Sequence, residues 1–263
     1  MSSGRWDDLT TRVVTGIVLA AITLTAIWAG GAAVVLLCAV AAGLMIWELS
    51  GLVDPGNTVL RNLGGALAAL TIVAFSYAPG FMALGLFLCV PGLAAGLPPG
   101  RRRWIFAGYG ALVLLGAMGV VSVRTGPGLA PVLWLIGIVI AADIGGYFGG
   151  KLFGGARFWP RLSPKKTWSG TISGWVLAAL TGLILGSPSM PVVGLALLSA
   201  FLAFVGQMGD IAESAVKRHV GVKDASALLP GHGGLLDRFD SMIAVFALAL
   251  AIRYTALLPG TGF

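Results

Sequence analysis

The chain has 263 residues, of which 57% are hydrophobic and 10% are charged, and its formal net charge is +7. A mean hydropathy of +0.95 excludes a soluble globule with a polar exterior. The composition therefore indicates an integral membrane protein. Since the basic residues flank apolar segments, they favour anionic lipid headgroups, and not nucleic acid, as partners.

Apolar segments of about 17 to 22 residues recur nine times, and each is long enough to cross a hydrocarbon core of about 30 Å. They lie at 13–29, 31–52, 60–78, 80–97, 104–123, 129–150, 170–188, 191–216 and 239–258. The predicted fold is an all-α, polytopic membrane protein with about nine transmembrane helices.

The basic residues are distributed unevenly between the two sides that nine spans would define. With the N-terminus in the cytoplasm, 15 of the 17 Lys and Arg residues fall on the cytoplasmic side, and Arg124 and Arg253 fall outside. Cytoplasmic loops of membrane proteins carry such an excess. The pattern predicts a cytoplasmic N-terminus, and loss of one span would scatter the later charges to both sides.

Glycine is abundant, with 40 residues, and the sixth predicted span contains two overlapping GxxxG pairs at 145–149 and 146–150. Small residues let membrane helices approach closely, so these glycines indicate helix packing and leave a homodimer open. Cys38 and Cys89 lie inside apolar spans, where a cysteine behaves as a small packing residue.

Two polar groups occur in the sixth predicted span and in the loop that follows it. Asp143 lies within the sixth span, near its cytoplasmic end, where it is either part of a functional site or a hydrogen-bonding group between helices. In the following loop, two lysines beside hydroxyl groups suit phosphate binding, although the same residues also fit a simple basic cytoplasmic loop. These residues are Ser163, Lys165, Lys166 and Thr167.

A third polar group ends the eighth predicted span. Four residues spaced at i, i+3, i+4 and i+7 share one face of a helix, and they are Asp210, Glu213, Ser214 and Lys217. An amphipathic helix end is the structural alternative. A carboxylate that follows the apolar run 200–206 nevertheless needs a partner.

A fourth polar group opens the ninth predicted span, where Asp237 and Asp240 again share one helix face. Gly233 and Gly234 precede them and allow the backbone to approach a ligand closely. Carboxylates from two facing helix ends, beside Lys and Arg, are what a magnesium–nucleotide site requires. The sequence contains no CxxC or HExxH motif, so a metal would need oxygen ligands.

The run from Ser214 to Asp240 resembles the signature of the phosphatidate cytidylyltransferases, also called CDP-diacylglycerol synthases. The shared residues are Ser214, Lys217-Arg218, Lys223-Asp224, Pro230, His232-Gly233-Gly234 and Asp237-Arg238-Phe239-Asp240. A looser resemblance covers about 140–245, whereas the first half matches only as hydrophobic spans. The family usually carries Glu or Gln where this chain has Ser169.

The resemblance implies transfer of a cytidylyl group from CTP to phosphatidic acid, giving CDP-diacylglycerol and pyrophosphate for phospholipid biosynthesis. It places the enzyme in the inner (plasma) membrane, with its active site at the cytoplasmic face. We divide the chain into N-terminal membrane helices at 1–128 and a catalytic membrane region at 129–263. His232 either contacts phosphate and handles a proton or braces the Gly-Gly turn.

The implied site has three sets of residues. Asp210 and Asp237 are the expected ligands of Mg²⁺, in a site for one or two divalent cations, with Asp143, Glu213 and Asp240 as further candidates. The expected catalytic residues are Asp210, Asp237, Lys223, Arg238 and His232. The expected substrate-binding residues are Ser163, Lys165, Lys166, Thr167, Ser214, Lys217, Arg218, Gly233 and Gly234.

Two alternatives stay open. The first is a related CTP-dependent enzyme acting on another lipid, such as a CDP-archaeol synthase or a polyprenol kinase, which substrate assays would separate. The second is a secondary transporter whose intramembrane carboxylates couple ions to a substrate. Transporters often show inverted repeats and interrupted helices near the middle of the membrane, whereas these carboxylates gather at one face in the second half.

Overall fold

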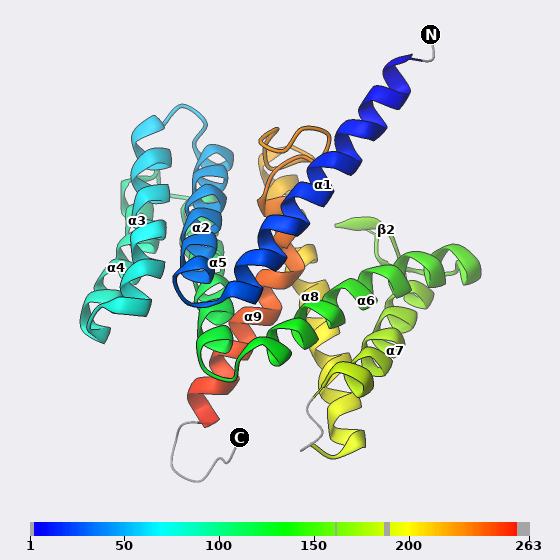
Figure 1. Cartoon of the computed structure of the whole chain (residues 1–263). Helices are drawn as coiled ribbons and strands as arrows, with labels where there is room; N and C mark the ends of the chain where they lie inside the picture. The colour runs from blue at the N-terminus through cyan, green and yellow to red at the C-terminus, as the bar shows by residue number, and fades with distance from the viewer. Residues whose placement is uncertain (1–2, 161, 187–189, 257–263) are drawn as a thin grey trace.

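The computed structural model describes residues 3–160, 162–186 and 190–256, with the side chains of 13–255 apart from 161, 164 and 187–189. Nine α-helices follow one another in this part of the chain (Figure 1). They are α1 (Ser3–Ala29), α2 (Gly31–Val53), α3 (Thr58–Tyr77), α4 (Gly80–Gly92), α5 (Arg101–Thr125), α6 (Leu129–Phe153), α7 (Trp168–Leu185), α8 (Val192–Val220) and α9 (Leu236–Ala256). A short 3-10 helix, η1 (Leu93–Gly96), follows α4.

Each of these helices coincides with one of the nine predicted apolar segments. Six of them are long and apolar enough to cross a membrane, and they are α2, α3, α5, α6, α7 and α8. Val13–Ala29 and Gly80–Gly96 are shorter apolar helices. The prediction of a helical membrane protein is therefore confirmed, and the count of nine spans stays a prediction.

Local residues set the helix ends. Asn57 caps α3 with its side-chain oxygen, which accepts a hydrogen bond from the N–H of Leu60 at 2.9 Å. Pro79 separates α3 from α4. At the end of α8, Gly221 adopts a left-handed conformation with φ 84°, which favours glycine. Helix α8 thus continues through 210–217, as the spacing of its charged residues predicts.

The segment between α6 and α7 was expected to be a loop, but it forms an antiparallel hairpin of β1 (Arg157–Trp159) and β2 (Ser163–Thr167). Thr167 ends the hairpin and caps α7, because its Oγ1 accepts a hydrogen bond from the N–H of Gly170 at 3.2 Å. Ser169 donates a hydrogen bond to the carbonyl oxygen of Gly154. Strand β2 therefore holds Lys165 and Lys166 beside the first turn of α7.

Glycines permit close contact between helices. A Cβ at Gly145 would lie 2.8 Å from the carbonyl oxygen of Ser173, so α6 and α7 approach through their backbones. Likewise, a Cβ at Gly116 would lie 2.7 Å from the carbonyl oxygen of Ile243, which brings α5 against α9. The glycines of α6 thus pack within the chain, and a homodimer stays a prediction.

The two ends of the helix bundle differ in character. The turn between α2 and α3 and the segment before α9 lie at the same end (Figure 1). At the opposite end, Arg253 Nη1 donates to the carbonyl oxygen of Ser122 at 2.5 Å, and Arg124 Nη2 donates to that of Trp28 at 2.9 Å. The two basic residues predicted to lie outside therefore donate hydrogen bonds to carbonyl oxygens at helix C-termini.

Candidate active site

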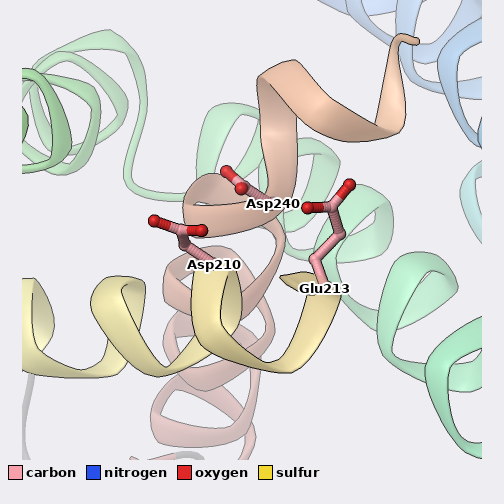
Figure 2. A group of neighbouring side chains, drawn as sticks. All are labelled: Asp210, Glu213 and Asp240. Atoms are coloured by element: carbon pink, nitrogen blue, oxygen red, sulfur yellow. The ribbon is translucent and has the colours of Figure 1, made fainter. Parts of the chain in front are cut away.

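Three carboxylates from α8 and α9 converge. Asp210 and Glu213 project from α8 toward Asp240 on α9 (Figure 2), and each offers one oxygen such that all three lie within 4.8 Å of one another. Gly209 makes this approach possible, because a Cβ there would lie 2.6 Å from the carbonyl oxygen of Asp240. We call Asp210, Glu213 and Asp240 the carboxylate cluster.

Two lysines flank the carboxylate cluster. Lys166 from β2 forms an ion pair with Asp210, and both side chains are about one-quarter exposed. Lys217 lies one turn beyond Glu213 on α8 and pairs with it at 2.5 Å. Glu213 itself is fully buried, and its Oε1 has no hydrogen-bond partner within the described residues. The cluster thus combines an unpaired buried oxygen with positive charge at its edge.

Asp237 lies beside the cluster but has a different set of partners. Its Oδ1 accepts from Lys217 Nζ at 2.5 Å, and its Oδ2 accepts from the N–H groups of Ala225 and Gly234, each at 2.8 Å. Burial raises the pKa of Asp237, but these hydrogen bonds outweigh that effect and hold the pKa below its ordinary value. Asp237 therefore ties α8 to the segment before α9.

The segment 221–235, which we call the signature loop, is held by a carboxylate that the sequence reasoning missed. Glu48 on α2 is buried, and its oxygens accept hydrogen bonds from the N–H groups of Leu235 and Leu236 at 2.9 and 2.8 Å. Its Oε1 also accepts from Ser226 Oγ at 2.5 Å. Glu48 thereby caps α9. The sequence feature that could have revealed Glu48 is that it is a lone carboxylate in the apolar segment 31–52.

The glycines of the signature loop fit this arrangement closely. Gly233 has φ +82°, which an L side chain rarely adopts. A Cβ at Gly234 would lie 2.8 Å from Glu48 Oε1 and 3.1 Å from Asp237 Oδ2. These glycines let the backbone donate to two carboxylates, so their structural role is to close the loop around Glu48 and Asp237.

A cavity of about 180 Å³ opens beside the carboxylate cluster, between α6, β2, α7 and α8. Asp143, Lys165, Lys166 and Thr167 line it together with Gln207, and we call it the lysine cavity. Lys166 connects it with the cluster through Asp210. The structure therefore brings the first three polar groups of the sequence to one place.

Comparisons with known proteins show which family the chain belongs to. A sequence model described as the Cytidylyltransferase family matches residues 10–256. The chain belongs to the cytidylyltransferase family. It is 37% identical over 261 residues to the phosphatidate cytidylyltransferase of Brucella suis biovar 1, covering 92% of each chain. It is 34% identical over 264 residues to that of Pseudomonas aeruginosa, covering 93% of this chain and 97% of the relative.

A third relative, the phosphatidate cytidylyltransferase of Bacillus subtilis, is 42% identical over 121 residues, or 45% of each chain. Membership of this family makes the protein a nucleotidyltransferase enzyme, as the signature from Ser214 to Asp240 predicted. The match over nearly the whole chain also includes α2, which carries Glu48.

The remaining predicted residues of this cytidylyltransferase lie around the site at different depths. Ser214 Oγ donates to Asp210 Oδ1 at 3.4 Å, and Ser163 begins β2. Arg218 and Lys223 are exposed near the end of α8 and in the signature loop. Arg238 is also exposed, and its Nε donates to the carbonyl oxygen of His232 at 2.9 Å. The predicted roles of these residues stay predictions.

Proposed function

We propose that this protein transfers CMP from CTP to phosphatidic acid, producing CDP-diacylglycerol and pyrophosphate. The observation that carries the proposal is the carboxylate cluster, which faces the lysine cavity through the Lys166–Asp210 pair. Phosphate groups of two substrates and a divalent cation require this combination of negative and positive side chains. The relatives from Brucella suis and Pseudomonas aeruginosa are named phosphatidate cytidylyltransferases, which supports the same substrates.

The reaction needs no covalent enzyme intermediate. An oxygen of the lipid phosphate attacks the α-phosphorus of CTP, the bond from that phosphorus to the oxygen bridging to the β-phosphorus breaks, and pyrophosphate leaves with the bond electrons. Since a phosphate monoester is already ionised near neutral pH, no base is required to activate it. The protein then acts by positioning the two phosphates and by neutralising charge.

We assign Asp210, Glu213 and Asp240 as the residues that would hold Mg²⁺. They fit the ion because their oxygens converge within 4.8 Å and Glu213 Oε1 is buried without a hydrogen-bond partner among the described residues. A bound Mg²⁺ would neutralise charge on the nucleotide phosphates. Asp237, expected from sequence as a ligand, has fixed donors on both oxygens, which favours a positioning role.

The cations are assigned by their place around the cluster. Lys165 and Lys166, which line the lysine cavity, bind the triphosphate and stabilise the departing pyrophosphate. Lys217 keeps Glu213 and Asp237 in position. Of the exposed signature residues, Lys223 and Arg238 meet the lipid phosphate, because they lie on the loop side of the cluster.

We further propose nine membrane spans with a cytoplasmic N-terminus, in the plasma membrane, with the active site at the cytoplasmic face. The separation of Arg124 and Arg253 from the end that holds the signature loop supports this orientation (Figure 1). Most of the site lies in the proposed catalytic region 129–263, and the helices of 1–128 contribute Glu48 to its support.

The test is an assay of detergent-purified protein with CTP and phosphatidic acid, with Mg²⁺ or with a chelator. We expect one pyrophosphate for each CDP-diacylglycerol, and no product without the metal. Asp240→Asn should lower turnover by about 100-fold and raise the Mg²⁺ concentration needed for half-maximal activity, since it removes one charge from the ion's ligands.

The matched control is Asp54→Asn, because Asp54 lies at the end of α2 and bonds Asn57 outside the site. It should retain turnover and Mg²⁺ dependence. Unchanged Mg²⁺ dependence of a folded Asp240→Asn protein would contradict the metal assignment. Product from another phosphorylated lipid, and none from phosphatidic acid, would contradict the proposed acceptor.

A further inference from the structure

A second cavity, of about 310 Å³, lies between α1, α2, α5, α9 and the signature loop. Its α9 residues include Phe239 and Ile243, whereas α8 packs on a different face of α9, at Ser241 and Ala244. Thr23 carries the one hydroxyl among the described lining residues. We call this space the apolar cavity.

The apolar cavity reaches the signature loop, where Leu228, Leu229 and Leu235 line it. Leu235 adjoins the N-terminal turn of α9 that Glu48 caps. Phe239 adjoins Asp240 of the carboxylate cluster. The loop and the first turn of α9 therefore separate an apolar compartment from the charged one by a single layer of chain.

Polar groups lie at the loop end of the apolar cavity. His232 packs on α1, because a Cβ at Gly16 would lie 3.5 Å from its Nε2, and Gly16 is one helical turn before Leu19 in the lining. The Nδ1 atom of His232 is buried and has no hydrogen-bond partner within the described residues. The exposed Arg238 is bonded to the carbonyl oxygen of His232. His232 and Arg238 thus lie just beyond the loop end of the cavity, next to its apolar lining.

We infer that the apolar cavity binds one acyl chain of the phosphatidic acid substrate, with the lipid phosphate at the His232–Arg238 end. The inference rests on the proposed function, and it adds a site for the hydrocarbon part of the substrate. CTP does not fit, because the lining offers almost no partners for its polar atoms. Transfer of an acyl chain from lipid hydrocarbon into this apolar lining costs almost no free energy. The phosphate of the same lipid gains contacts with His232 and Arg238.

The position of α1 suits a substrate that comes from the membrane. On its other face α1 exposes apolar side chains such as Ile17 and Leu24, so in the proposed nine-span topology this face meets lipid hydrocarbon and the opposite face meets the cavity. In Figure 1, α1 crosses in front of α9 and the segment before it. A lipid that enters along α1 therefore brings its headgroup to the signature loop.

The test introduces larger side chains into the apolar cavity from two helices. Ala41 on α2 and Thr23 on α1 both line it, and we expect Ala41→Phe and Thr23→Phe each to raise KM for dipalmitoyl phosphatidic acid at least tenfold. Both variants should leave KM for CTP, and turnover of dihexanoyl phosphatidic acid, within twofold of the parent, because a six-carbon chain does not reach the filled space.

The matched control is Ala21→Phe, because Ala21 is exposed and points away from the lining residues of α1. It should leave the chain-length profile unchanged. If Ala41→Phe and Thr23→Phe both fold and keep the parental profile, the inference is wrong.

A second measurement is independent of turnover. Phosphatidic acid with a photoreactive group in its acyl chain should label residues 37–45 and 239–246, and phosphatidylcholine with the same chain should label them at least tenfold less. Labelling of these residues by an enzyme that forms no CDP-diacylglycerol would contradict the proposed function alone. Product formation with labelling elsewhere, or equal labelling by both lipids, would overturn the acyl-chain site.

Discussion

Buried carboxylates in this protein fall into two kinds, which differ in their partners. Glu48 and Asp237 accept hydrogen bonds from fixed backbone N–H groups and from Ser226 or Lys217. Members of the carboxylate cluster instead face one another, and Glu213 Oε1 has no hydrogen-bond partner among the described residues. A buried carboxylate whose oxygens all have fixed donors holds structure, whereas an oxygen without a donor is free to bind a cation. The hydrogen-bond partners thus distinguish the carboxylates that hold the structure together from those proposed to bind the metal.

At the scale of the residue, Glu48→Ala should destabilise the protein by about 2–4 kcal/mol, because two N–H groups of α9 and the Ser226 hydroxyl lose their acceptor. Thermal unfolding in detergent measures the loss. Turnover of any remaining folded protein should also fall, since the signature loop loses its anchor on α2.

Glu48→Gln is the matched control, because a glutamine of the same shape keeps one acceptor oxygen for these donors. It should recover at least half of the lost stability. Equal stability of Glu48→Ala and the parent would show that the cap contributes nothing.

At the scale of the element, the site depends on how closely α5, α8 and α9 approach. Gly209 brings α8 against the backbone of Asp240, and Gly116 brings α5 against Ile243. Since α9 is held from both sides by backbone contact, its first turn has little freedom to shift. Helix packing therefore fixes where Asp240 meets Asp210 and Glu213.

Gly116→Val should destabilise the protein by about 1–3 kcal/mol, because the added side chain meets the α9 backbone and forces the helices apart. Gly108→Val is its control on the same helix, since a Cβ at Gly108 has nothing within 4 Å. Both substitutions change the helix propensity by the same amount. Unfolding midpoints of the two variants measure the difference, and equal midpoints would contradict close α5–α9 packing.

At the scale of the whole molecule, the active site is assembled from segments far apart in sequence. Lys166 comes from β2, the carboxylates come from α8 and α9, and Glu48 supports the loop from α2. All lie in, or on helix ends next to, connections that the proposed nine-span topology places on one side. The proposal that the active site faces the cytoplasm thus depends on the orientation of several loops together.

Single cysteines test this orientation in a background in which Cys38 and Cys89 are replaced by alanine. Gly56→Cys, in the turn between α2 and α3, should resist an impermeant maleimide in intact cells and react after the membrane is opened. Thr125→Cys, at the end of α5, should react in intact cells. Both positions are exposed, and the reverse pattern would place the active site on the other face.

Much of this protein is determined by its sequence locally. The nine helices appear where apolar segments of membrane length were predicted, because segment length and hydropathy act within one stretch of chain. The shared helix face of Asp210, Glu213 and Lys217 follows from the helical period alone. The signature from Ser214 to Asp240 predicted the enzyme family for the same reason, since its fixed spacings are visible in one run of residues.

Tertiary structure decided what depends on distant contacts. Glu48 meets Leu235 across 187 residues of chain, and no local pattern pairs them. The donors around Asp237 and the pairing of Lys166 with Asp210 likewise require that loops meet in space. The apolar cavity exists only where α1, α2, α5 and α9 leave space between them. A sequence specifies which groups are available, whereas burial and partners, which set the role of each charge, are properties of the packed fold.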